Sequence, residues 1–239
     1  MSGGADATRP ALPTLTDAML ARRQLHVVIA LDTSGSMRGD RIASLNYAMR
    51  SAMPELRNAA ADNPEIEVMI RVLQFDSTAR WQTARAVRVD EFEWTDLEAG
   101  GETRMGEALA LIANALSDQN MPGRQLPPVI VLVSDGYPSD DIDAALDAFF
   151  AAELPRAAVR IGIAIGGEAD LEILQRFMNR PALEPLRANN APMLVNHIKW
   201  ATTAPVKAVS SPTTDPDPLR TISKDNPSRL ADAASDIVW

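Results

Sequence analysis

The sequence predicts an α/β fold in which helices cover both faces of a mostly parallel β-sheet. Three short runs rich in Val and Ile are typical of strands buried on both faces, and segments with helical spacing of apolar residues lie between them. The buried runs are LHVVIAL at 25–31, VIVLVS at 129–134 and VRIGIAI at 159–165. Because strands and helices alternate along the chain, we expect parallel strands joined by helical crossovers.

The expected helices follow from apolar residues that recur every three or four positions. We expect the first helix from about Arg41 to Ala60, with Pro54 bending it or ending it early. The remaining helices are expected at 103–116, 142–150, 171–178 and 192–201.

Two further segments predict strands that are less completely buried. Residues 65–75 alternate between apolar and polar positions, which is the pattern of a strand with one face partly open to solvent. Residues 84–89 give a weaker strand pattern.

Composition divides the chain into three parts. Residues 1–23 mix Gly, Ala, Pro and Thr and predict a flexible leader, and residues 24–203 carry the folded domain. Residues 204–239 are dense in Pro, Ser, Thr and Asp and have too little apolar surface to offset the entropy of ordering. We therefore expect a disordered tail, although its last residues, LADAASDIVW, would also suit a short docking peptide.

The charge and the residue inventory exclude several classes of function. The formal net charge of -9 would repel a nucleic-acid backbone, so no nucleic-acid partner is expected. The absence of cysteine excludes disulfides, thiolate zinc sites and cysteine nucleophiles. We see no secretory signal and no apolar stretch near the roughly 20 residues that span a bilayer. A cytoplasmic protein without a membrane partner is expected.

Oxygen-bearing side chains gather where the predicted strands end. Asp32, Ser34 and Ser36 follow the first strand, Thr103 lies in a Gly-containing loop before a helix, and Asp135 ends the strand at 129–134. Sites in such sheets form at the carboxyl ends of the strands, and hard divalent cations prefer oxygen ligands. Asp and Ser are also common turn residues, so the first loop alone would fit a plain turn.

As a set, these five residues resemble the metal-ion-dependent adhesion site of von Willebrand factor type A (VWA) domains. The resemblance covers about residues 24–203 and implies a Rossmann-like, doubly wound, mostly parallel sheet with one antiparallel edge strand, which we identify with residues 65–75. It implies Mg²⁺, with Mn²⁺ or Ca²⁺ as alternatives, and a partner protein that supplies a Glu or Asp to the metal. It implies a binding module rather than an enzyme. We expect Asp32→Ala or Thr103→Ala to abolish partner capture and leave the fold intact.

A nearer resemblance rests on LDTSGSMRGDRIASLNYAM, QFDSTAR and SDGYPSDD. These runs are similar to the bacterial TerY group of tellurite-resistance-associated VWA proteins, which implies an adaptor in a stress-response or defence system with a serine/threonine kinase and a metal-dependent phosphatase. Three alternatives stay open: a partner or substrate recruiter of an AAA+ ATPase, a metal-dependent phosphatase, and an extracellular adhesin, which the missing signal disfavours.

Other chemistry-bearing residues have simpler interpretations. Asp76 is expected to form a turn after its strand, and Asp140 and Asp141 to favour the start of the helix that follows them. Tyr137 is expected to be exposed beside the metal-bearing edge. Trp81 and Trp94 are expected either to join Tyr137 in a partner-facing rim or, equally well, to pack in the core. His26 and His197 are expected to pack in the protein interior.

Overall fold

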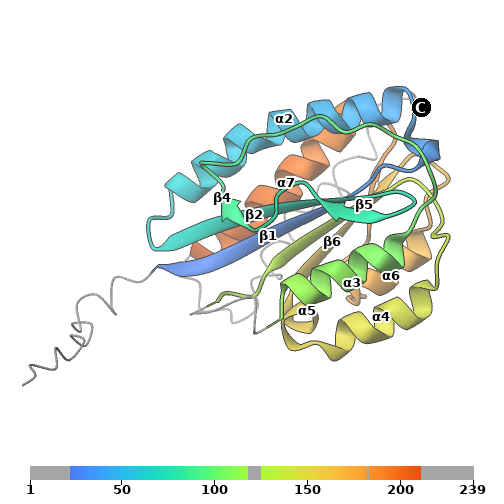
Figure 1. Ribbon diagram of the computed structural model, residues 1–239. Helices are drawn as coiled ribbons and strands as arrows, with labels where there is room; N and C mark the ends of the chain where they lie inside the picture. The colour runs from blue at the N-terminus through green and yellow to red at the C-terminus, as the bar shows by residue number, and fades with distance from the viewer. Residues whose placement is uncertain (1–21, 118–124, 182, 211–239) are drawn as a thin grey trace, which may run out of the picture.

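The computed structural model describes residues 22–117, 125–181 and 183–210. The predicted leader lies outside the described residues up to position 21, and the predicted tail from position 211 onward. The described residues form a seven-stranded sheet. This sheet lies between the helices in Figure 1.

The sheet has the strand order β3-β2-β1-β5-β6-β7, with β4 paired to β2. Five of the strands run parallel to one another: β1 (Arg23–Asp32), β2 (Ile66–Phe75), β5 (Val129–Ser134), β6 (Val159–Ile165) and β7 (Leu186–Ala188). The short strands β3 (Ala79–Trp81) and β4 (Val87–Arg88) are antiparallel to β2. The predicted fold class, a Rossmann-like and mostly parallel sheet with an antiparallel edge, is confirmed.

The placement of the antiparallel strand was wrong. Residues 66–75 pair in parallel with β1 over their whole length, and the antiparallel edge comes from β3 and β4. The alternation in β2 has another cause. Its residues Ile66, Val68 and Ile70 face a fully covered side of the sheet, whereas Glu67 and Arg71 on the other side are only partly buried.

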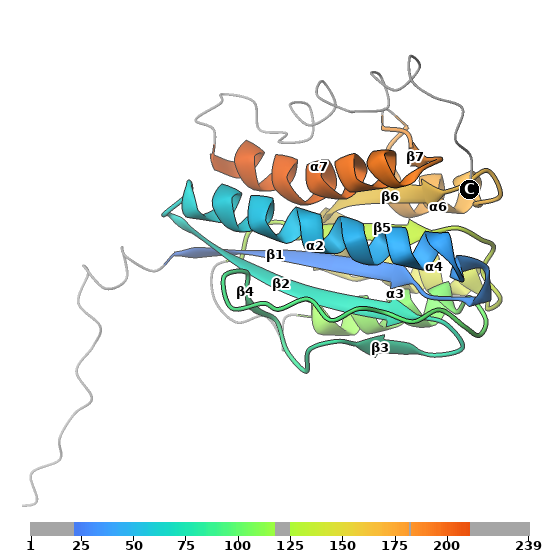
Figure 2. The same ribbon diagram turned by 90° about the horizontal axis from the view of Figure 1, so that it is seen from above.

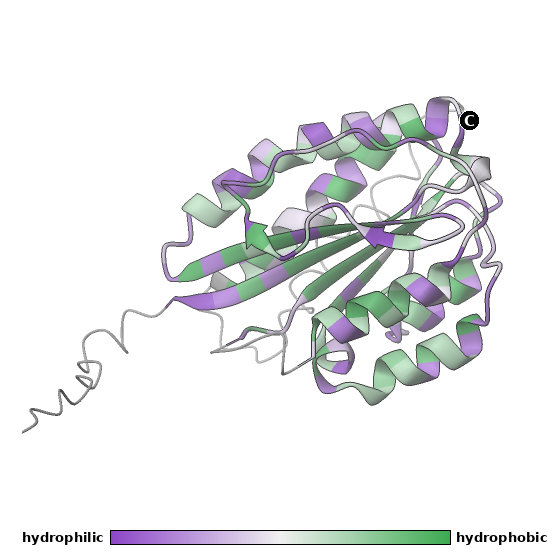
Figure 3. Cartoon of the chain, viewed as in Figure 1, coloured by the Kyte–Doolittle hydropathy of each residue, from purple (hydrophilic) through white to green (hydrophobic). Residues whose placement is uncertain are grey.

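Helices cover both faces of the sheet. One face carries α2 (Asp40–Ala61) and α7 (Ala191–Ser210), which lie side by side in Figure 2. The other face carries α3 (Met105–Ala115), α4 (Ile142–Ala151), α5 (Glu153–Ala157) and α6 (Leu171–Met178). The apolar residues accordingly form two buried clusters, one on each side of the sheet, and the strands are the most apolar elements in Figure 3.

Helix α2 has the predicted extent, and α7 is longer than predicted. Helix α2 continues through Pro54 to Ala61, because Met49, Met53 and Leu56 keep one apolar face packed in the core while Pro54 itself is exposed. Helix α7 runs to Ser210 rather than ending at Ala201. Since Val206 within it is fully buried, the residues just after position 203 pack with the domain.

None of the described helices is long and apolar enough to cross a membrane.

Candidate functional site

The strand order brings two of the predicted site loops together. Strands β1 and β5 are parallel neighbours, and Leu31 pairs with Val133 one residue before the end of each strand. Asp32 and Ser134 therefore end adjacent strands at the same edge of the sheet. The turn η1 (Gly35–Met37) follows β1 at this edge and carries Ser36.

Asp32 is buried and held by two hydrogen bonds. Its Oδ1 accepts from the Ser34 backbone N–H at 2.8 Å, and its Oδ2 accepts from the Ser134 hydroxyl at 2.6 Å. The Asp32 side chain is 0% exposed. Truncation to Ala would leave two buried donors without an acceptor. Asp32→Ala should therefore destabilise the fold, contrary to the expectation from the sequence.

A chain of short contacts links the remaining polar groups. The Ser34 and Ser36 Oγ atoms lie 3.0 Å apart, and the Ser36 hydroxyl donates to Asp135 Oδ1 at 2.7 Å. The Arg41 guanidinium donates to the other carboxylate oxygen, Asp135 Oδ2, at 2.6 Å. We refer to Asp32, Ser34, Ser36 and Asp135 as the hydroxyl–carboxylate cluster.

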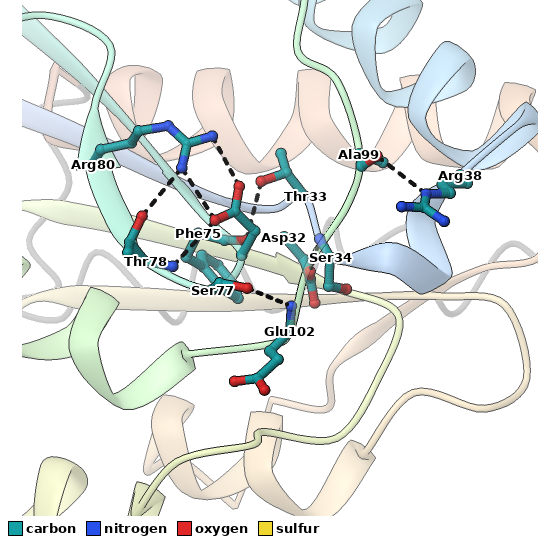
Figure 4. Close-up of polar contacts among 11 residues, drawn as sticks. Asp32, Thr33, Ser34, Arg38, Phe75, Ser77, Thr78, Arg80, Ala99 and Glu102 are labelled. Carbon is teal, nitrogen blue, oxygen red and sulfur yellow. Dashed lines mark hydrogen bonds and ion pairs between the residues drawn. The ribbon is translucent and has the colours of Figure 1, made fainter.

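Thr103 reaches the same edge through backbone contacts. The segment before it pairs with the first loop, with Gly35 N–H donating to Gly101 O at 2.9 Å and Gly100 N–H donating to Thr33 O at 2.8 Å. Figure 4 shows Asp32 and Ser34 beside this segment. Thr103 is 8% exposed. All five residues predicted for the site thus lie on loops that meet at one edge of the sheet.

Burial and a nearby like charge shift the pKa of Asp32 in the cluster. Removal from water raises the pKa of Asp32 to about 6, and the nearby negative charge of Asp135 adds to this rise, while hydrogen bonds from Ser134 and Ser34 oppose it. Two carboxylates are therefore held out of water and close enough to repel each other. Such an arrangement is stabilised by a positive charge placed between them or beside them.

A cation here would depend on hydroxyl oxygens. Among the described residues, no group of three or more His, Asp or Glu side chains forms a metal-binding cluster, and the chain has no cysteine. Two carboxylates combined with serine and threonine hydroxyls would instead supply hard oxygen ligands of low total charge.

The other acidic residues near this edge have structural roles. Asp76 forms the predicted turn, accepting from Thr78 N–H at 3.1 Å, and pairs with Arg80 at 2.8 Å. Asp141 caps α4 through the Ala144 N–H, as predicted. Asp140 differs, because its carboxylate accepts from the N–H groups of Gly106 and Glu107 at the start of α3, a helix that precedes it in the chain.

Two members of this environment were not predicted from the sequence. Ser134 holds Asp32, and Arg41 holds Asp135. The signal for Ser134 was its place as the last residue of a buried strand. Arg41 was predicted only as the first residue of a helix, and its approach to Asp135 depends on tertiary structure.

The aromatic and histidine side chains agree with most of their interpretations. Tyr137 is 68% exposed, as predicted for a residue beside this edge. Trp81 and Trp94 are half-buried. His26 and His197 are buried, in β1 and α7 respectively.

Taken together, these features define a Rossmann-like α/β protein with an oxygen-lined site at the carboxyl edge of its sheet. Residues 27–138 match the family model of the von Willebrand factor type A domain. This stretch includes every residue of the predicted site. No curated protein is similar enough in sequence to count as a relative.

Solved structures share the fold. A von Willebrand factor type A protein from Catenulispora acidiphila is 16% identical, with a TM-score of 0.58, and the match covers 78% of this chain and 43% of that one. The ArnB paralog VWA2 from Sulfolobus acidocaldarius is 17% identical, with a TM-score of 0.55 and coverage of 74% and 45%. The chain thus spans less than half the length of these structures.

One similar structure holds a metal. Proximal thread matrix protein 1 from the mussel byssus, with a zinc-occupied MIDAS motif, is 14% identical, with a TM-score of 0.52. The match covers 77% of this chain and 46% of that protein. At these identities the likeness concerns the fold.

Proposed function

We propose that this chain is a metal-dependent protein-binding module. Asp32, Ser34, Ser36, Thr103 and Asp135 would hold a divalent cation, and a Glu or Asp of a partner protein would bind to it. The observation that carries the proposal is the hydroxyl–carboxylate cluster: two buried carboxylates and two serine hydroxyls at the edge of the sheet where such domains place their loops.

The spacing of the hydroxyls favours a small cation. In an octahedron with metal–oxygen distances of 2.0 to 2.1 Å, adjacent ligand oxygens lie about 2.9 Å apart. The Ser34 and Ser36 oxygens are 3.0 Å apart. Mg²⁺ is therefore our proposed ion. Mn²⁺ is an alternative, whereas the longer bonds of Ca²⁺ would require the two hydroxyls to separate.

The chain's own residues keep negative charge away from the ion. Asp32 is occupied by Ser34 N–H and Ser134, and Asp135 by Ser36 and Arg41, so each carboxylate already has donors for both oxygens. A cation bound mainly by neutral hydroxyls retains its attraction for an outside carboxylate. This favours partner binding over catalysis, and we propose that the protein is not an enzyme.

The proposed setting is bacterial and cytoplasmic. The similarity to the TerY group supports an adaptor in a stress-response or defence system, with a serine/threonine kinase and a metal-dependent phosphatase as partners. We further propose that the residues before β1 act as a leader and that the residues after α7 act as a tail. Neither nucleic acid nor membrane is a proposed partner, given the net charge of -9.

Thermal unfolding tests the metal site first. A ligand at 100 times its Kd stabilises a protein by about 2.7 kcal/mol, so saturating Mg²⁺ is expected to raise Tm by several degrees. Ser36→Ala should remove this rise, and its own Tm in EDTA is the baseline, because the change also removes the hydroxyl donor to Asp135 Oδ1. Ser51→Ala, which alters a hydroxyl on α2 that donates only to Tyr47 O, is the matched control. An equal Mg²⁺ effect in Ser36→Ala would refute the site.

A pull-down from bacterial lysate tests the binding function. The full chain in Mg²⁺, the full chain in EDTA and Ser36→Ala are compared by mass spectrometry. A kinase or phosphatase captured only by the full chain in Mg²⁺ would support the proposed setting. An AAA+ ATPase captured in the same way would keep the metal-dependent module and replace the setting. Identical capture in all three samples would contradict metal-dependent binding.

A further inference from the structure

A cleft lies on the sheet face that carries α3, away from the hydroxyl–carboxylate cluster. Helix α3 has 11 residues and is about 16 Å long, whereas β1 and β2 have 10 residues each and extend about 33 Å. The helix therefore covers about half of these two strands, and Figure 1 shows it beside the half nearer their carboxyl ends.

Where α3 ends, a cleft of about 340 Å³ opens between the sheet and the β3–β4 segment. This volume is in the range of sites that hold small molecules. The residues of its lining that matter here are His26, Arg71, Trp81, Arg85, Leu111 and Leu116. Because residues in a strand rise about 3.3 Å each, His26 lies about 20 Å along β1 from Asp32.

Arg71 is held rigidly in this cleft. Its guanidinium carbon lies 3.8 Å from the centre of the Trp81 ring, and one terminal nitrogen donates to Ala84 O at 2.7 Å. Its Nε is buried and has no hydrogen-bond partner among the described residues. Partial burial lowers the pKa of Arg71. The side chain thus offers a fixed positive charge with an unused donor.

His26 supplies a second unused polar atom. The residue is 8% exposed, and within the described parts of the chain its Nε2 has no hydrogen-bond partner. Buried polar atoms are almost always satisfied in folded proteins, so one left without a partner beside a cleft calls for an explanation. A ligand group in the cleft would provide one.

The charge of the lining is opposite to that of the protein. The chain carries a net charge of -9, but among the described residues the lining of the cleft has two arginines and no acidic side chain. The neighbouring acid Glu67 is engaged by Gln24 at 2.8 Å and lies 3.7 Å from Arg88. Leu111, Leu116 and the Trp81 ring supply the apolar part of the wall.

We propose that this cleft binds a small organic anion with a carboxylate or phosphate group on a flat, apolar body. The anionic group would lie against Arg71 and Arg85, and the apolar body would lie against Trp81 and the end of α3. This site is separate from the hydroxyl–carboxylate cluster and needs no metal.

Nuclear magnetic resonance of the full chain in EDTA tests the proposal. The probes are phenyl phosphate and benzoate, with benzyl alcohol as a neutral match of similar shape. Both anions are expected to shift the indole N–H signal of Trp81, assigned with Trp81→Phe, and the amide signals of residues 84–86. Because charge-assisted hydrogen bonds are worth roughly 1.5–3 kcal/mol, benzyl alcohol should bind at least about tenfold more weakly.

Variants separate the site from unspecific attraction. Arg85→Gln and Arg71→Met should each weaken anion binding by about tenfold, because each removes one charged donor. Arg176→Gln, a surface change on α6 where the side chain pairs with Asp143, should leave binding unchanged. If Arg71→Met unfolds because it loses the contact with Ala84, Arg85→Gln alone tests the proposed site. Absence of shifts with both anions, equal binding of the alcohol, or equal weakening by Arg176→Gln would overturn the proposal.

Discussion

The guanidinium of Arg41 lies 2.6 Å from the Asp135 carboxylate, and the Asp135 side chain is fully buried. The chain thus places its own positive charge against one of the two carboxylates of the hydroxyl–carboxylate cluster. Gly166, with a φ of 74°, makes room for this side chain, since a Cβ there would come within 3.2 Å of the guanidinium.

This contact predicts that the positive charge of Arg41 weakens the binding of a metal ion near Asp135. Arg41→Gln should tighten Mn²⁺ binding by about fivefold, equivalent to about 1 kcal/mol, since a nearby positive charge is removed. Isothermal titration calorimetry measures the change. Arg38→Gln is the matched control, because Arg38 is exposed and donates only to Ala99 O. Unchanged or weaker Mn²⁺ binding in Arg41→Gln would show that the contact does not oppose the ion.

Gly101 offers a test of how the loop before Thr103 is held. It has a φ of 85°, and a Cβ would lie 2.6 Å from the Ser77 Oγ, so Gly101→Ala should lower stability by at least about 1 kcal/mol. It should also weaken Mg²⁺ binding through displacement of Thr103. Gly167→Ala is the control, because no atom lies within 4 Å of its added Cβ. Urea unfolding measures the first effect and calorimetry the second, and equal behaviour of the two variants would contradict this account.

Asp140 is predicted to stabilise α3 across a long sequence separation. Asp140→Ala leaves the N–H groups of Gly106 and Glu107 without their acceptor, and the expected loss of stability is about 1 kcal/mol. Urea unfolding provides the measurement. Asp143→Ala, which removes an exposed ion pair with Arg176, should cost much less. A larger loss in Asp143→Ala would be the opposite of what this capping arrangement implies.

The lowered pKa of His26 predicts that the protein loses stability in mild acid. Burial, assisted by the charge of Arg71, lowers the pKa of His26 from 6.5 to about 4. Below pH 6.5 the unfolded chain binds a proton that the folded chain refuses until about pH 4, so stability falls as the pH falls through this window. The full effect is on the order of 3 kcal/mol.

His26→Phe removes this titration. Urea unfolding at several pH values should show a shallower decline for the variant between pH 6.5 and 4 than for the unchanged chain. Near pH 7.5 His26 is neutral in both the folded and the unfolded chain, so the comparison there isolates the packing effect of the substitution. Parallel declines in the two proteins would indicate that His26 does not contribute.

The parts of the fold that sequence predicts are those with a strong local signal. Strands β1, β5 and β6 are continuous apolar runs, and burial on both faces leaves such runs no other arrangement in a mixed α/β chain. Strand β4 lies within the weak strand predicted at 84–89, but the antiparallel edge was not assigned to β3 and β4, because these strands have three and two residues, too few to display an alternation. The alternation of apolar and polar residues in β2 was visible in the sequence, but it reflects the different degrees to which the two faces of this strand are buried.

The residues of the candidate site also fall into those with a local sequence signal and those without one. Asp32, Ser34, Ser36 and Asp135 were predictable because each follows a strand whose end could be read from the sequence. Arg41 was not, since an arginine in the first turn of a helix usually faces solvent, and only the packing of α2 against the sheet brings it to Asp135. Asp140 likewise caps a helix that no local pattern connects to it.

The reciprocal backbone hydrogen bonds between the first loop and the Gly100–Gly101 segment have a kinetic consequence. They fix both loops at the moment of folding, so the entropy of arranging the site is lost before any partner arrives. Encounter with a partner would then require docking alone and no loop closure. Association should follow a single exponential whose rate rises linearly with partner concentration, without the plateau that a rate-limiting rearrangement produces.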